Sequence, residues 1–243
     1  WRTVWQGIAV LIILFLPLVI ITTIKSVNLN SRELDNNFKK KKIKIKNWRR
    51  IEVIKDFRFY ILSLNMLATP WIATGIFVYQ SFITDSKMWE VYTIPKAFMV
   101  YSITSIATLF LSGFLIDKFT GRKLILFMNI PLLLAMIVLF QFNQEHFAYI
   151  FLGLVGISNG FSNILGSSTW AEIYGVKYIG SIKALTTAFM VFSTAFGTAV
   201  FGLLIDNGFS IEYIALVGGV YTVISLILLI FFRKTIEPVK ALH

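Results

Sequence analysis

Cysteine is absent from the 243-residue chain, and charged residues are scarce. Without a thiol the chain has no disulfide framework, no thiolate metal site and no cysteine nucleophile. Asp, Glu, Lys and Arg make up 14% of the residues, whereas 57% are hydrophobic and the mean hydropathy is +0.76. A soluble domain of this size could not bury so much apolar surface. The composition therefore predicts an all-α polytopic membrane protein.

Titratable residues are also missing from the middle of the long apolar segments. The two histidines, His146 and His243, lie outside these segments, and Glu172 and Lys96 stand at segment ends. An intramembrane enzyme would need a buried nucleophile and base or paired carboxylates. We therefore expect no enzymatic activity, no cofactor and no metal site.

Seven apolar segments are long enough, at about 20 residues each, to cross a hydrocarbon layer of roughly 30 Å. Lipid offers the backbone no hydrogen-bond partners, so each segment is expected to be one helix, with Pro17, Pro70 and Pro131 as tolerated kinks. The segments run from Val4 to Ile24, Phe59 to Ile83, Pro95 to Ile116, Leu124 to Phe142, Phe147 to Ile173, Ile182 to Ile205 and Ile211 to Phe232.

The segment from Lys25 to Arg58 is the polar part of the chain, with KKKKIKIKNWRR from Lys39 to Arg50 at its centre. This predicts four parts: a transmembrane helix at 1–24, a basic loop at 25–58, a six-helix bundle at 59–232 and a tail at 233–243. The basic run contains Trp48 but no nucleic-acid recognition motif around it, so we expect no nucleic-acid partner. Its charge suits the anionic surface of a lipid bilayer.

The distribution of positive charge predicts the orientation in the membrane. If the basic loop is cytoplasmic, then all of the 23 Lys and Arg residues except Arg2, Lys87 and Lys96 lie on the cytoplasmic side. This is the asymmetry that the positive-inside rule describes. The chain is therefore expected to start outside and to end in the cytoplasm.

Two apolar segments end alike on opposite membrane faces. GFLIDKFTGRK, from Gly113 to Lys123, ends the third segment inside, and GLLIDNG, from Gly202 to Gly208, ends the sixth segment outside. Three spans followed by three inverted spans are typical of transporter halves. We call Gly113 to Lys123 the signature loop.

The signature loop resembles the loop motif of the major facilitator superfamily, which reads roughly Gly, x, Leu, x, Asp, Arg or Lys, x, Gly, Arg, Arg or Lys. One residue more than usual stands at Phe119 and Thr120. Trp170 to Phe189 is also similar to the junction of helices ten and eleven in bacterial members. The matching positions are Gly113, Leu115, Asp117, Lys118, Gly121, Arg122 and Lys123.

The resemblance covers essentially the whole chain and implies helix six, the central cytoplasmic loop and helices seven to twelve of a secondary transporter. Such a protein moves a small solute across the plasma membrane by alternating access. By this resemblance an N-terminal six-helix half is missing, and we expect the chain alone not to transport. A coupling residue would then lie in that half, because the spans of this chain carry no titratable group in their middle.

Charged residues near the signature loop are candidates for a gate at the cytoplasmic side. Asp117 with Arg122 is the favoured pair, because a switch between two states needs only a few kcal/mol in total. The expected gate residues are Gly113, Asp117, Lys118, Gly121, Arg122, Lys123, Glu172 and Lys177.

The least apolar spans are expected to line the solute cavity. Asn159 and Asn163 are four residues apart and share a helix face, whereas Gly156 and Gly160 form a GxxxG pattern typical of helix packing. Through the resemblance, the second and fifth spans correspond to the cavity-lining helices seven and ten. The candidate cavity residues are Asn65, Thr69, Trp71, Gln80, Asn159 and Asn163.

Two other interpretations remain open at this point. A seven-helix receptor shares the span count, but Ile211 to Phe232 has neither a Lys for a retinal link nor an Asn-Pro kink. A self-standing half transporter that dimerises is the other alternative. The solute stays unidentified, with a weak suggestion of monocarboxylates from the Trp170 to Phe189 junction.

Overall fold

The computed structural model describes residues 2–17, 20–21 and 46–237, and it divides the chain near residue 44 into two units. The first unit contains a short apolar helix, Arg2–Pro17, which covers most of the first predicted span. The end of that span, most of the predicted loop 25–58 and the last residues of the predicted tail lie outside the described residues.

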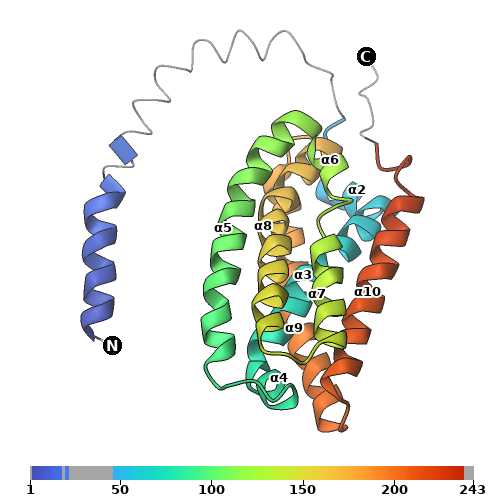
Figure 1. Cartoon of the computed structure of the whole chain (residues 1–243). Coiled ribbons are helices and arrows are strands. Elements are labelled where there is room, and N and C mark those ends of the chain that lie inside the picture. The colour runs from blue at the N-terminus through green and yellow to red at the C-terminus, as the bar shows by residue number, and fades with distance from the viewer. Residues whose placement is uncertain (1, 18–19, 22–45, 238–243) are drawn as a thin grey trace. The chain divides into compact units, whose positions relative to one another are not determined.

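The second unit is an all-helical bundle (Figure 1). Among the described residues, five helices are long and apolar enough to cross a membrane, which confirms a polytopic membrane protein. The membrane-crossing helices are α3 (Phe57–Val78), α5 (Thr93–Phe119), α8 (His146–Tyr174), α9 (Ile179–Asp206) and α10 (Ile211–Phe231), and the shorter ones are α2 (Arg50–Ile54), α4 (Gln80–Ser86), α6 (Gly121–Leu124) and α7 (Ile130–Gln141).

The fourth predicted span is not one helix, and that prediction was wrong. The chain from Leu124 to Phe142 leaves α6, passes through turns at 125–129 and begins α7 only at Ile130. Asn129 is the N-cap residue of α7, and Pro131 lies in its first turn instead of kinking a helix interior. Proline suits the first turn because the N–H groups there have no partner within the helix.

The second predicted span is also divided. The helix expected from Phe59 to Ile83 ends at Val78, and α4 begins after Tyr79. Pro70 lies inside α3 as expected. The helix α3 alone has 22 residues and a length of about 33 Å, so it can cross the membrane without α4.

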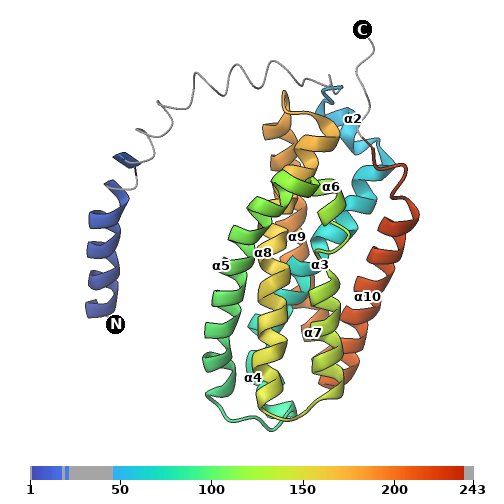
Figure 2. The ribbon, with the colours of Figure 1, turned by 45° about the horizontal axis from the view of Figure 1, so that its top comes forward.

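The helices pack in pairs that repeat. Two helices, α5 and α7, pack against α8. Two others, α9 and α10, pack against α3. Exchanging α3 with α8, α5 with α9 and α7 with α10 therefore maps these neighbour pairs onto one another. Since α3 and α8 run in opposite directions in Figures 1 and 2, the pairing is that of an inverted three-plus-three repeat.

Glycines allow the closest of these helix pairs to touch. A Cβ atom at Gly156 would lie 2.5 Å from the carbonyl oxygen of Tyr101, and one at Gly160 would lie 2.6 Å from that of Ser105. In the corresponding pair, a Cβ atom at Gly197 on α9 would overlap the carbonyl oxygen of Trp71 on α3. The predicted packing role of the GxxxG pattern is confirmed.

Polar side chains connect the loops at each of the two ends of the bundle. We call the end that carries the signature loop and the start of α3 the signature end, and the other end the distal end. At the distal end the buried Lys87 ammonium lies 2.8 Å from a carboxylate oxygen of Glu212 and donates to the amide oxygen of Asn143 at 2.7 Å. These contacts join the α4–α5 and α7–α8 loops to the first turn of α10.

Candidate functional site

A cavity of about 250 Å³ lies between α3, α8 and α9. Its lining is mixed: hydroxyl and amide groups alternate with Met, Leu and aromatic side chains. Trp170 forms part of the wall, and Lys183 is the one charged residue that lines it. The polar groups are those of Ser63, Ser162, Asn163, Ser167, Thr186 and Thr187.

The cavity has the chemistry of a site for a small polar solute. Hydroxyl and amide groups can both donate and accept hydrogen bonds, and the apolar walls exclude water from the rest of the solute surface. Lys183 lies in the second turn of α9, near the signature end, and adds one positive charge. The sequence did not single out Ser63, Thr186 or Thr187, and only their positions on three packed helices bring them together.

The six candidate cavity residues do not form one site. Asn163 lines the cavity. The Asn159 amide nitrogen donates instead to the Ser105 hydroxyl on α5 at 3.2 Å, so this side chain belongs to the α5–α8 contact. Gln80 is the first residue of α4, half-exposed at the distal end.

Trp71 lies in an aromatic cluster rather than in the cavity. It is 3% exposed, and its indole ring makes edge-on contacts with Phe196, Phe201 and Tyr221. This is a packing environment between α3, α9 and α10.

Asn65 and Thr69 belong to a buried polar cluster where α7 begins. The Thr69 hydroxyl donates to the Asn129 amide oxygen at 3.1 Å, and the Asn129 amide nitrogen donates to the main-chain carbonyl oxygen of Asn65 at 2.6 Å. The Ser158 hydroxyl donates to the Met128 carbonyl at 3.1 Å. These contacts hold the non-helical segment at 125–129 against α3 and α8, as backbone in an apolar layer requires.

Asn129 is a residue that the sequence analysis missed. Asn129 lies inside the apolar segment from Leu124 to Phe142, which is predicted as one continuous helix. An Asn followed two residues later by Pro is nevertheless a signal for the start of a helix, since both residue types favour the first positions.

At the signature loop, the hydrogen bonds and the ion pair between α6 and α8 are all made by Glu172. Its carboxylate accepts hydrogen bonds from the main-chain N–H groups of Gly121 at 2.7 Å and Arg122 at 3.2 Å. The Arg122 guanidinium lies 3.7 Å from the same carboxylate. A Cβ atom at Gly121 would lie 2.7 Å from the Ser168 hydroxyl, so α6 approaches α8 closely at this residue.

The expected pairing of Arg122 with Asp117 is not what the structure contains. Asp117 is exposed at the end of α5 and makes no ion pair within the described residues, whereas Arg122 faces Glu172 on α8. Thr120, at the inserted position, has a positive φ of 72° and therefore interrupts the helical conformation between α5 and α6. That turn directs Arg122 away from α5.

The remaining candidate gate residues are dispersed. Gly113 has open space where a side chain would be, and the Lys118 ammonium lies 5.3 Å from the centre of the Phe119 ring. Lys123 lines a separate pocket next to α10. The Lys177 ammonium lies 5.5 Å from the centre of the Tyr178 ring.

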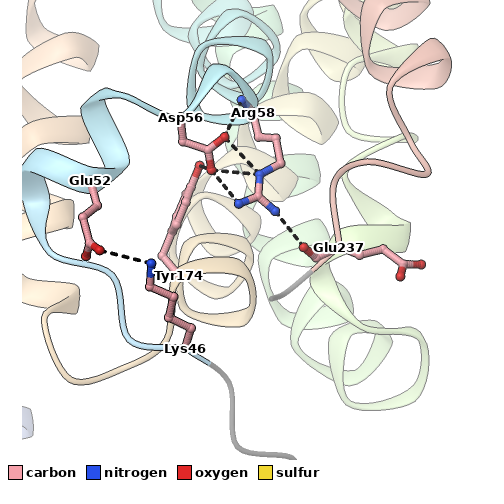
Figure 3. A network of polar contacts seen from close by, with 6 residues as sticks. All are labelled: Lys46, Glu52, Asp56, Arg58, Tyr174 and Glu237. Atoms are coloured by element: carbon pink, nitrogen blue, oxygen red, sulfur yellow. Dashed lines mark hydrogen bonds and ion pairs between the residues drawn. The ribbon is translucent and has the colours of Figure 1, made fainter. Parts of the chain in front are cut away.

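A buried ion pair lies at the signature end of the bundle (Figure 3). The carboxylate of Asp56 lies 2.7 Å from the Arg58 guanidinium, and both side chains are more than nine-tenths buried. The Tyr174 hydroxyl donates to Asp56 at 3.1 Å, and Arg58 donates to the Glu237 carbonyl at 2.8 Å. The pair thus connects the start of α3, the end of α8 and the segment after α10.

A second ion pair at this end is exposed. Lys46 lies 3.1 Å from Glu52, and the main-chain N–H of Arg49 donates to the same carboxylate at 2.7 Å. The Arg49 N–H and the Lys46 ammonium lower the pKa of Glu52 below its ordinary value.

A family model described as Major Facilitator Superfamily matches residues 60–242. No curated protein and no solved structure matches the chain. The matched residues begin within α3 and include the cavity, the signature loop and all helices that follow.

Proposed function

Because this chain belongs to the major facilitator superfamily, a family of transporters, we propose that it is the C-terminal part of a secondary transporter that moves a small solute by alternating access. The observation that carries this proposal is the cavity between α3, α8 and α9. Its neutral polar groups can bind a solute directly, and its walls come from both three-helix repeats. A relative movement of such repeats would change the access to the cavity.

The solute that fits this lining best is small, polar and anionic. Lys183 supplies the only charge at the cavity, while the hydroxyl groups of Ser63, Ser162 and Ser167 can donate to an oxyanion. Monocarboxylates satisfy this chemistry. Proton or ion coupling is assigned to a part of the transporter outside residues 59–232, since the spans of this chain carry no acidic group in their middle.

The proposed topology places the signature end in the cytoplasm of a cell whose plasma membrane the bundle crosses. Among the described residues of the second unit, Lys and Arg are concentrated at this end and only Lys87 and Lys96 lie at the distal end, which fits the positive-inside rule. Residues 1–24 then form helix six, 25–58 the central loop, 59–232 the C-terminal bundle and 233–243 a cytoplasmic tail. A six-helix N-terminal half is the partner that completes the solute path.

The absence of cysteine makes the proposal testable without knowing the solute. In the product of the complete reading frame, with any cysteines outside these residues removed, Asn163→Cys is expected to react with an impermeant maleimide from both membrane faces. Alternating access exposes the cavity to each face in turn. Labelling in right-side-out and inside-out vesicles measures this, with Ser181→Cys and Ser86→Cys as controls that react from the signature and distal sides only. Reaction of Asn163→Cys from one face would exclude alternating access.

The gate is proposed to be the contact between Glu172 and the first turn of α6. Glu172→Gln weakens a charge-assisted contact, so the closed state at the signature end loses about 1 kcal/mol. Labelling of Asn163→Cys from the signature side is then expected to become about fivefold faster. Glu52→Gln, at an exposed ion pair of the same end, is the matched control and leaves the rate unchanged. Equal rates in Glu172→Gln and the parent would remove Glu172 from the gate.

A further inference from the structure

We propose that the seam between α7 and α10 binds one anionic phospholipid. Its phosphate headgroup occupies a basic pocket at the signature end, and one of its acyl chains lies in an apolar groove along the same two helices. The two helices are neighbours in Figures 1 and 2. The proposal requires only that the bundle lies in a membrane, so it is independent of the solute and of the transport direction.

The basic pocket has a volume of about 360 Å³ and lies where α6 and the turns after it meet the end of α10. Three cations line it, Arg122, Lys123 and Arg233, against one carboxylate, that of Glu237. Lys123 and Arg233 are exposed and have no ion pair within the described residues, whereas Arg122 is shared with Glu172 at 3.7 Å. The excess of positive charge fits a phosphate group.

The walls of the same pocket are apolar. Leu126, Phe127 and Leu229 lie next to the cations, and Phe127 is 56% exposed. A free water-soluble anion bound to these cations would leave the exposed Phe127 ring uncovered. Cations beside exposed apolar side chains instead match an amphiphile, whose charged group and hydrocarbon begin within a few ångströms of each other.

The apolar groove supplies the second, independent observation. It has a volume of about 370 Å³ between α7 and α10, and it is lined by apolar residues and Gly219. Its α10 residues run from Ile224 back to Ala215, and Leu229 of the basic pocket is one and a half turns further along the helix. At about 1.5 Å per residue, Leu229 and Leu216 are about 20 Å apart along the axis, so pocket and groove together match the depth of one leaflet, about 15 Å of hydrocarbon plus the headgroup.

Gly219 keeps this groove open. A Cβ atom there would meet only the Cβ of Met136, at 3.6 Å, which is an ordinary contact. A Cβ atom can therefore be added at this position without displacing a helix, and a leucine side chain extending from it is expected to fill the groove. Gly219→Leu is thus a variant that removes the acyl-chain site and leaves the cations in place.

The test is native mass spectrometry of the purified 243-residue chain in detergent, titrated with phosphatidylglycerol or with phosphatidylcholine of the same acyl chains. We expect one retained phosphatidylglycerol with an affinity several-fold above that of phosphatidylcholine. Arg233→Gln and Lys123→Gln should each weaken it by about fivefold, since each removes one cation near the headgroup. Lys234→Gln, the adjacent cation outside the pocket, should leave it unchanged.

Two further measurements test the contribution of the apolar groove separately from that of the basic pocket. Gly219→Leu is expected to reduce phosphatidylglycerol binding as well, and glycerol phosphate without acyl chains should compete weakly. Strong competition by glycerol phosphate, or no effect of Gly219→Leu, would mean a free-anion site and would overturn the proposal. Equal binding of both lipids, or an equal effect of Lys234→Gln, would mean a general lipid shell and would overturn it too. Circular dichroism of each variant confirms that its helices are intact.

Discussion

Replacement of Asp56 with alanine is expected to destabilise the bundle by about 3 to 5 kcal/mol, the range for breaking a buried ion pair at one partner. Arg58 would remain with its side chain only 8% exposed and without its carboxylate. Tyr174 would lose the acceptor of its hydroxyl, and α3 would lose its N-cap, because Asp56 accepts from the Arg58 main-chain N–H at 3.1 Å. The measurement is the free energy of unfolding in mixed detergent micelles, followed by circular dichroism.

A matched variant separates burial from charge. Glu52→Gln removes the charge of a carboxylate at the same end of the bundle, where both partners are about 40% exposed, and should change stability by no more than about 1 kcal/mol. The double variant Asp56→Leu/Arg58→Met should recover part of the loss from Asp56→Ala, because it leaves no unpaired buried charge. If Asp56→Ala and Glu52→Gln behave alike, the Asp56–Arg58 pair does not hold the three segments together.

The second large effect is expected at Gly156. Gly156→Ala should destabilise the bundle by about 1 to 3 kcal/mol, because the added methyl group would lie 2.5 Å from the Tyr101 carbonyl oxygen and force α5 away from α8. The neighbouring atom is main chain and cannot rotate aside. Mixed-micelle unfolding, with helix content as the signal, measures the loss.

Gly166, on the same helix, provides the control. No atom lies within 4 Å of a Cβ atom built there, so Gly166→Ala should be neutral or stabilising by up to about 1 kcal/mol through its higher helix propensity. The same substitution on one helix is thus expected to have opposite signs at two positions ten residues apart. A stable Gly156→Ala variant would show that the α5–α8 seam can open without loss.

The sequence was sufficient for features that depend on local pattern. Hydropathy located the long helices, and the GxxxG pattern located the seam at Gly156 and Gly160. The family followed from the signature loop, whose spacing is local, and the family model confirms it.

The sequence was not sufficient where the partner is distant along the chain. Arg122 has Asp117 five residues away and Glu172 fifty residues away, and the backbone turn at Thr120 directs it to the second. The cavity could not be located from the sequence for the same reason, because its lining residues are distant from one another along the chain. Ser63 and Thr187 are ordinary hydroxyl residues until three helices bring them to one place, and the polarity of a single span does not indicate which side faces inward.

The shortness of α7 has a consequence for how the protein enters the membrane. With 12 residues α7 is about 18 Å long, so the segment at 125–129 must cross the remaining depth through hydrogen-bonded turns instead of a regular helix. Ser158 and Thr69 stabilise this segment, and Ser158 is synthesised after it. The Met128 carbonyl therefore gains its Ser158 partner only when α8 has been synthesised, so α6, α7 and α8 are expected to leave the translocation channel as one unit.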